Sequence, residues 1–147
     1  MRGLALRFGI IGVILIGGFL VRQFVMGDAG SLTVGECFDL PAGGPQEIGE
    51  VQHHPCTDAH LAEVIFVGDY TGSEQTYPSK DAFRAFVLDR CIPAFNSYTG
   101  LDYNAATDLD VGPMWPTAEG WGRGDHEVTC FAVKVDGSTF TGSVKKR

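Results

Sequence analysis

An uncharged apolar run near the start of the chain divides it into two unequal parts. The run covers residues 8–21 and reads FGIIGVILIGGFLV. Extended to residues 4–26, it is long enough for a membrane-spanning helix, with Arg7 and Arg22 near its two ends. Arg2 and Arg7 precede the run, and basic residues tend to stay on the cytoplasmic side. The sequence therefore predicts a single-pass cell-membrane protein with a cytoplasmic N-terminus and an extracytoplasmic C-terminal domain.

A cleaved signal peptide is the alternative interpretation of this run, because a charged start and a short apolar stretch are typical of one. The small residues of Gly27-Asp28-Ala29 offer a cleavage site, but an aspartate lies inside it and Arg22 follows the apolar residues. We therefore favour a retained anchor. The expected organisation is a transmembrane anchor with a short cytoplasmic start at 1–27, a tether at 28–31 and an extracytoplasmic domain at 32–147.

The part of the chain beyond the anchor is strongly acidic. The whole chain has a formal net charge of -7, from 11 basic and 18 acidic residues. Arg2, Arg7 and Arg22 belong to the anchor. The domain therefore has roughly eight basic residues, whereas all 18 acidic residues of the chain lie in it or in the tether. Such a domain repels phosphate backbones, so nucleic acid is excluded as a partner. The membrane is expected to be contacted through the N-terminal helix.

All four cysteines lie beyond the apolar run, at Cys37, Cys56, Cys91 and Cys130. An even number of widely spaced cysteines without a C-x-x-C motif favours two structural disulfides in an oxidising compartment. Four reduced, buried cysteines are the alternative. Four cysteines allow three pairings, and the spacing does not choose among them.

The domain's hydrophobic pattern predicts several short strands and one main helix. Ser79 can cap a helix that begins at Lys80, and Phe83, Phe86 and Cys91 recur at helical spacing. Pro93 is expected to interrupt or kink this helix.

Apolar and alternating stretches predict strands on both sides of this helix. The residues from 101 to 119 are rich in turn formers and acidic residues, which predicts a loop. The last predicted strand is expected to pair back across a turn at Gly137. Because strands and helix do not alternate regularly, the predicted class is α+β, with a mostly antiparallel sheet, one main helix and two disulfides, preceded by a single transmembrane helix. The predicted strands cover 32–38, 48–54, 62–67, 128–135 and 139–144.

An ordered set of motifs in the domain resembles the actinobacterial septum formation domain family, from about residue 32 to residue 144. The resemblance implies exported modules of cell-envelope proteins, often behind a single membrane helix, with a link to division septa and no established catalytic residues. It also implies the pairings Cys37–Cys56 and Cys91–Cys130. His126 stands where the family pattern would have an arginine. The motifs are Val34-Gly35-Glu36-Cys37-Phe38-Asp39, Val51-x-x-x-Pro55-Cys56-x-x-x-His60-x-x-Glu63-Val64, Cys91, Phe95, Pro116-Thr117, Trp121, Gly124-Asp125, Val128, Cys130 and Thr141-Gly142-Ser143.

The cluster of metal-ligand residue types around Cys56 is the first candidate for chemistry. It comprises His53-His54-Pro55-Cys56, Asp58 and His60. Zinc needs about four such ligands, but adjacent histidines on a strand point to opposite faces and a disulfide would consume Cys56. We therefore predict no metal and no cofactor here, and expect His60 to be a structural hydrogen-bonding residue near the Cys56 bridge, beside Glu63.

A faint calcium-loop pattern runs from Asp102 to Pro113. It lacks the glycine at its sixth position, where Thr107 stands, and the glutamate at its twelfth. An acidic, solvated loop is the favoured interpretation. Known hydrolase motifs are missing from the sequence, and paired cysteines cannot act as nucleophiles, so we predict that the protein is not an enzyme.

A candidate binding surface is formed by His60, Trp115, Trp121 and Asp125, with Tyr98 and Tyr103 as further aromatic side chains. We expect a non-catalytic envelope module that acts in septum formation or envelope assembly through contacts with envelope or division proteins. One alternative is a module that binds cell-wall glycan or peptide, since aromatic side chains with acidic neighbours suit such ligands. A metal-dependent envelope hydrolase is a distant alternative.

Overall fold

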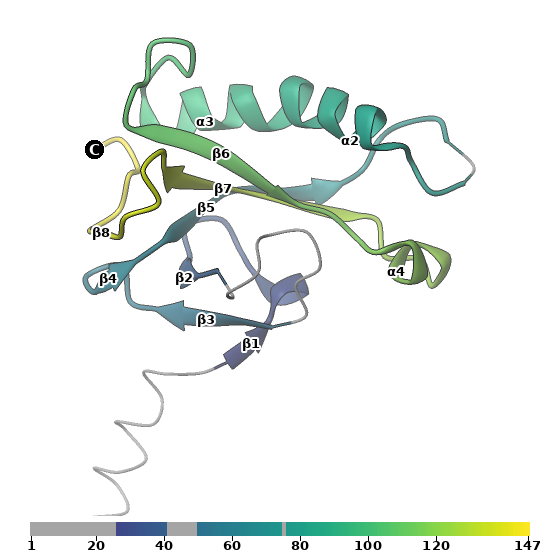
Figure 1. Cartoon of the computed structure of the whole chain (residues 1–147), viewed down its shortest axis with the longest axis horizontal. Helices are drawn as coiled ribbons and strands as arrows, with labels where there is room; N and C mark the ends of the chain where they lie inside the picture. Colours follow the sequence, from purple (N-terminus) through teal and green to yellow (C-terminus); the bar gives the residue numbers. More distant parts are fainter. Residues whose placement is uncertain (1–25, 41–49, 75) are drawn as a thin grey trace, which may run out of the picture.

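The computed structural model describes residues 26–40, 50–74 and 76–147. In these residues the main feature is a six-stranded, fully antiparallel sheet with the order β1-β3-β2-β5-β7-β6 (Figure 1). The two longest strands, β5 and β7, pair at its centre, as the alternating and apolar patterns of these two segments predict. The strands are β1 (Met26–Asp28), β2 (Cys37–Asp39), β3 (Glu50–His54), β5 (Ala62–Asp69), β6 (Leu109–Met114) and β7 (Glu127–Lys134).

The main helix lies along one face of the β5-β7-β6 part of the sheet (Figure 1). It runs through α2 (Lys80–Phe86), a π-helical turn η2 (Val87–Cys91) and α3 (Ile92–Thr99). The predicted cap is confirmed, because the Ser79 hydroxyl accepts a hydrogen bond from the backbone N–H of Ala82 at 3.2 Å. The π-helical turn ends two residues before Pro93, which has no backbone N–H to donate into a regular helix. Pro93 therefore interrupts the α-helical pattern without ending the helix.

The two faces of the sheet support separate hydrophobic cores. At the start of β5 the side chains alternate, so that Val64 belongs to one core and Ile65 to the other, whereas a register shift between Val64 and Phe66 places Phe66 on the same side as Ile65. The core beneath the helix includes Phe83, Phe86, Phe95, Val128 and Ala132. The opposite core contains Leu32, Phe38, Val51, Ala62, Val64, Met114 and Phe131.

The Cys91–Cys130 disulfide joins the main helix to β7, as the family resemblance implies. The second bridge, Cys37–Cys56, ties β2 to the chain that follows β3. Both bridges have the expected pairing, and the described chain contains no free cysteine.

The prediction of a loop from 101 to 119 is wrong for two segments within it. Residues Leu109–Met114 form β6, and Ala118–Gly122 form the short helix α4, capped by the Thr117 hydroxyl. β6 contains Asp110, Gly112 and Pro113, which usually oppose strand formation. Proline is tolerated because β6 is an edge strand, and glycine is needed because a Cβ at Gly112 would lie 2.3 Å from the Phe131 ring.

The expectation that the last strand pairs back on β7 is also wrong. A strand has two edges, and β7 is already hydrogen-bonded to β5 on one edge and to β6 on the other. The final strand β8 (Phe140–Thr141) instead pairs with β4 (Ala59–His60) in a separate two-stranded sheet. This pairing places the last residues of the chain near the beginning of β5.

The predicted membrane span at 4–26 lies outside the described residues, apart from Met26. In the part of the chain that is described, no helix is long and apolar enough to cross a membrane. Of the residues expected to form a tether, Asp28 ends β1, and Ala29–Ser31 form a short 3-10 helix.

Candidate functional site

A fully buried carboxylate, that of Glu63, is the centre of the polar interior of the domain. Glu63 lies near the start of β5 and is 0% exposed. The Tyr98 hydroxyl on α3 donates a hydrogen bond to Glu63 Oε1 at 2.6 Å, and the Ser143 hydroxyl donates to the same oxygen at 2.5 Å. The backbone N–H of Val144 donates to Glu63 Oε2 at 2.7 Å. Three donors from two distant parts of the chain therefore satisfy both carboxylate oxygens.

The Glu63 contacts hold the C-terminal segment 142–146 against the domain. The backbone N–H of Gly142 donates to the carbonyl of Cys56 at 2.6 Å, and that of Lys146 donates to the carbonyl of Tyr98 at 2.9 Å. Together with the bonds from Ser143 and Val144, these contacts attach the segment to β5, to α3 and to the Cys56 turn. Glu63 thus has a structural function that local sequence patterns do not reveal.

The hydroxyl of Tyr98 stays protonated over a wide pH range. Burial of the ring, followed by the hydrogen bond to Glu63 and the nearby charge of Glu63, raises the pKa of Tyr98 from 10.0 to about 12. The phenol therefore remains a hydrogen-bond donor to Glu63 at neutral pH.

His60 lies in the same interior and is 0% exposed. Its Nδ1 is 2.8 Å from the carbonyl oxygen of Asp58, and its ring packs against Phe140 with centroids 4.4 Å apart. One ligand atom from each of Cys37, His60 and Glu63 lies within 4.8 Å of the other two. His60 is therefore a buried hydrogen-bonding residue beside Glu63 and the Cys37–Cys56 bridge, and it does not lie on an exposed surface.

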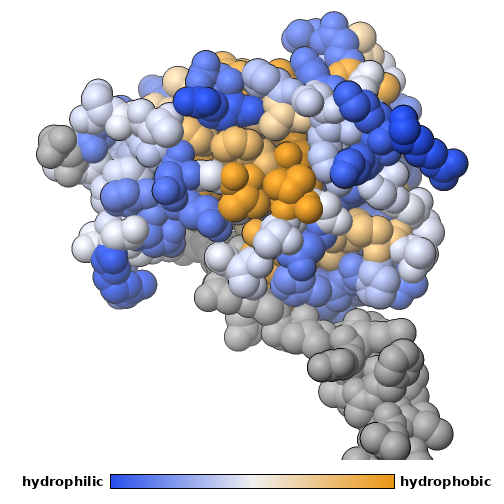
Figure 2. All heavy atoms as spheres, turned by 180° about the vertical axis from the view of Figure 1, so that it is seen from behind, coloured by the Kyte–Doolittle hydropathy of each residue, from blue (hydrophilic) through white to orange (hydrophobic). Residues whose placement is uncertain are grey.

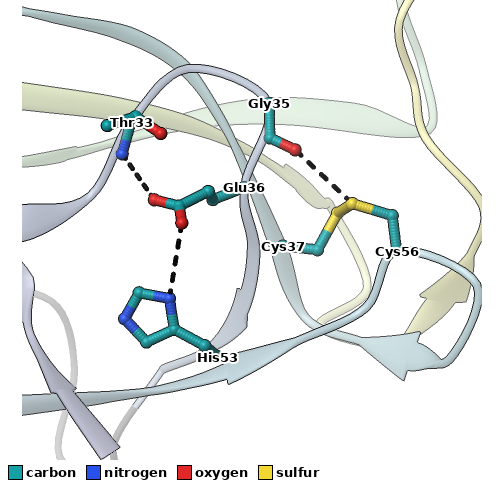
Figure 3. Close-up of polar contacts among 6 residues, drawn as sticks. All are labelled: Thr33, Gly35, Glu36, Cys37, His53 and Cys56. Carbon is teal, nitrogen blue, oxygen red and sulfur yellow. Dashed lines mark hydrogen bonds and ion pairs between the residues drawn. A yellow bond between two sulfur atoms is a disulfide. The ribbon is translucent and has the colours of Figure 1, made fainter. Parts of the chain in front are cut away.

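Figure 3 shows the loop that covers the Cys37–Cys56 bridge. The carbonyl oxygen of Gly35 contacts Cys56 Sγ at 3.5 Å, and Gly35 adopts a φ of +97°, which favours glycine. The Glu36 carboxylate accepts a hydrogen bond from the backbone N–H of Thr33 at 2.6 Å and lies 3.9 Å from His53 Nδ1. His53 is thus directed toward Glu36.

The two candidate tryptophans come together in an aromatic cluster at the other end of the main helix. Trp115 stacks on the buried ring of Phe83, with centroids 5.0 Å apart. Trp121 packs edge-on against Tyr70 and Tyr77, and its ring lies 4.1 Å from that of His126. Both tryptophans are half-buried, so much of their surface serves to pack the domain.

The residues of the faint calcium-loop pattern, for which an acidic loop is the favoured interpretation, form local hydrogen bonds. The Asp102 carboxylate accepts from the backbone N–H of Asn104 at 3.0 Å, and that of Asp110 accepts from the Tyr103 hydroxyl at 2.6 Å. In the residues that the structure describes, the group of Cys37, His60 and Glu63 is the only set of three potential metal ligands close together.

Asp125 is exposed and belongs to a small acidic group at the beginning of β7. Its carboxylate accepts a hydrogen bond from the backbone N–H of Glu127 at 3.2 Å. Glu127 stands directly opposite Asp69 on β5. Burial, followed by the charges of Asp125 and Asp69, raises the pKa of the Glu127 carboxyl. Ionisation of Glu127 is therefore less favourable in the folded protein than in the unfolded chain.

Replacing Glu127 with glutamine is expected to stabilise the domain at neutral pH by about 0.2–1 kcal/mol, the scale of a cross-strand pair. A raised folded-state pKa means that the wild-type domain loses stability as the pH rises past 4.5, the ordinary value of this carboxyl. The gain should therefore be present at pH 7 and absent at pH 3, as measured by urea unfolding. Glu119→Gln, which removes an exposed carboxylate facing Arg123, should give no gain at either pH. An equal gain from both variants would mean that general charge reduction, and not this site, is responsible.

Sequence reasoning identified His60 and the cysteines but missed the contribution of Ser143 and of the backbone at Val144. The spacing Cys56-x-x-x-His60-x-x-Glu63 was visible in the sequence, as was Thr141-Gly142-Ser143. The contact between Glu63 and Ser143 depends on the β4–β8 pairing, which brings together residues about 80 positions apart. No local periodicity encodes such a contact.

The geometry defines a small, disulfide-bonded α+β domain whose buried polar residues serve its own structure. The family model described as septum formation matches residues 34–146. The chain therefore belongs to the septum formation family. Comparisons with curated proteins and with solved structures give no match.

Proposed function

We propose that this protein is a membrane-anchored, non-catalytic extracytoplasmic module that acts in septum formation through contacts with other envelope proteins. The observation that carries the proposal is membership of the septum formation family over nearly the whole described domain. The anchor rests on the apolar run at 8–21, and the extracytoplasmic orientation rests on the arginines before it. Two disulfides are compatible with an oxidising compartment.

The buried Glu63 carboxylate and the hydroxyls around it are hydrogen-bonded to one another, which supports a binding function over a catalytic one. The Glu63 oxygens accept hydrogen bonds from Tyr98, Ser143 and the Val144 backbone, which leaves this carboxylate engaged within the protein. The Ser143 hydroxyl is directed at Glu63, so it donates its proton to a carboxylate and not to a histidine base.

The surface supports contacts with protein partners. Figure 2 shows apolar side chains gathered in one patch on the face opposite to the view of Figure 1, surrounded by hydrophilic side chains. Apolar patches with a polar rim are typical of protein-interaction sites. Large hydrophobic side chains that are exposed in the described domain are Val34, Tyr77, Leu88, Leu101 and Val135.

The position of the protein in dividing cells tests the proposal. A fluorescent protein that matures in the cytoplasm is fused to the N-terminus of the full chain, and a matched fusion carries residues 1–31 alone. We expect a band at midcell for the full chain and a uniform outline for the anchor-only fusion. A uniform outline for both fusions would contradict a septal function. Co-sedimentation of the protein with isolated cell walls would instead favour the alternative of a glycan- or peptide-binding module.

A further inference from the structure

The histidine beside the Cys37–Cys56 bridge has one ring nitrogen without a hydrogen-bond partner. His60 Nδ1 lies 2.8 Å from the carbonyl oxygen of Asp58, and a carbonyl only accepts, so Nδ1 carries the proton and donates it. The Nε2 atom is therefore left with a free lone pair. Within the described residues this buried nitrogen has no partner. Such unsatisfied buried atoms are rare in proteins and call for an explanation.

The surroundings of His60 are those of a metal ligand. Metal-bound histidines almost always donate their other ring N–H to a carbonyl or a carboxylate, as His60 does to Asp58. Cys37 and Glu63, which offer a sulfur and a carboxylate oxygen, lie within 4.8 Å of the His60 ligand atom and of each other. Sulfur, imidazole nitrogen and carboxylate oxygen are the donors that zinc prefers. The hydrogen bonds from Tyr98 and Ser143 orient the carboxylate, as outer partners do in known metal sites.

The disulfide keeps this set of ligands incomplete. Zinc binds a cysteine thiolate, whereas the Cys37 sulfur is bonded to that of Cys56. Reduction of the bridge releases the Cys37 thiol beside His60 and Glu63. The Cys56 thiol is released next to Cys37 but outside this close group, so it must move toward the group to serve as the fourth ligand, the number that structural zinc sites use.

The Cys37–Cys56 bridge is also the more accessible of the two. Cys56 is half-buried, whereas Cys91 and Cys130 are both 0% exposed. A thiolate of a dithiol reductant attacks Cys56 Sγ, the bond between the two sulfurs breaks, and Cys37 leaves as a thiolate. The second thiol of the reductant then releases Cys56 and closes the reductant's own disulfide. This exchange transfers two electrons, and zinc binding displaces the protons from the thiols.

We propose that reduction of the Cys37–Cys56 bridge converts this buried cluster into a zinc site formed by Cys37, Cys56, His60 and Glu63. In this site the unpartnered Nε2 atom of His60 binds the metal. The inference goes beyond a function in septum formation, because it makes the metal content of the domain depend on the redox state of one bridge.

Zinc binding to the full chain in its two redox states tests the proposal. The protein is reduced with dithiothreitol, freed of reductant under anaerobic conditions and titrated with zinc against a chromophoric chelator, beside an oxidised sample. We expect the reduced protein to bind one zinc ion per chain in competition with the chelator, and the oxidised protein to bind none. Cobalt in place of zinc should show thiolate-to-metal charge-transfer absorption. Equal binding by the reduced and oxidised samples would overturn the proposal.

Two histidine variants separate a built site from adventitious binding to free thiols. His60→Gln removes a ligand, whereas His53→Gln removes a histidine that is directed toward Glu36. We expect the zinc affinity of the reduced His60→Gln protein to fall by more than roughly 10-fold and that of His53→Gln to stay unchanged. Equal affinities of the two variants would contradict the site.

A third variant covers the case in which His60→Gln does not fold. Tyr98→Phe keeps every proposed ligand but removes one donor to Glu63. Its zinc affinity is expected to fall by roughly 10- to 100-fold, the effect of losing an outer hydrogen bond. Near-ultraviolet circular dichroism of each oxidised variant establishes that it is folded. A folded Tyr98→Phe protein with wild-type zinc affinity would argue against Glu63 as a ligand.

Discussion

Replacing Glu63 with leucine is expected to lower the free energy of unfolding by about 3–5 kcal/mol, because it removes three hydrogen bonds to a charged acceptor and each such bond contributes about 1.5–3 kcal/mol before water replaces the acceptor at the more exposed donors. The substitution leaves the Tyr98 hydroxyl, the Ser143 hydroxyl and the Val144 N–H without their common acceptor. A buried donor without a partner costs about 1–3 kcal/mol, and the cost here is smallest at Ser143, which is exposed, and larger at Tyr98 and Val144, which are half-buried. Leucine is close to glutamate in size and is readily buried, so the loss comes from the donors that lose their acceptor and not from the new side chain.

Glu63→Gln provides the matched comparison, because glutamine has nearly the same shape. Its carbonyl oxygen still accepts from Tyr98 and Ser143, but its amide N–H₂ faces the N–H of Val144, and two donors cannot pair. We expect a smaller loss, about 1–3 kcal/mol. Urea unfolding of the full chain, followed by tryptophan fluorescence, measures both variants against the wild-type protein.

The loss should be concentrated at the C-terminal segment. In the Glu63→Gln protein, hydrogen exchange is expected to rise at residues 142–146 before it rises in the β5–β7 pair, because Glu63 holds this segment to the sheet. Unchanged unfolding midpoints for both Glu63 variants would show that the carboxylate does not hold the fold together.

Replacing Cys91 and Cys130 together with alanine is expected to cost about 4 kcal/mol of stability, the chain-entropy value for a loop of this length. The bridge closes a sequence separation of 39 residues and joins the main helix to β7. Both sulfurs are fully buried in the core beneath the helix, together with Phe83, Phe86 and Phe95. Losing the bridge frees the unfolded chain and also leaves a small void in this core, and both effects favour unfolding.

The other bridge is the matched control for this variant. Cys37 and Cys56 are separated by 19 residues, so their replacement with alanine should cost less, about 3 kcal/mol. Thermal unfolding of the three proteins under oxidising conditions gives the order of stability. Equal stabilities of the Cys91–Cys130 variant and the wild-type protein would mean that helix packing alone holds the helix on the sheet.

Several elements of the fold follow from local chemistry that the sequence displays. Ser79 caps a helix because its hydroxyl satisfies a free N–H of the first turn, and this needs residues only three apart. The strands β5 and β7 follow from runs of branched and aromatic residues that suit a buried sheet. Cys91 lies on the apolar stripe of the helix, which predicts that it is on the buried face, and the structure confirms this.

Other elements arise from contacts between residues far apart in the chain. Gly112 and Pro113 form an edge strand because the Phe131 ring occupies the space beside the glycine and the sheet ends there. The last strand pairs with β4 because both edges of β7 are already occupied. Glu63 becomes the centre of the polar interior only when this pairing brings Ser143 and Val144 to it. Caps and alternation depend on neighbours within a few residues, whereas strand order and buried hydrogen bonds depend on which edges and donors the rest of the folded chain leaves free.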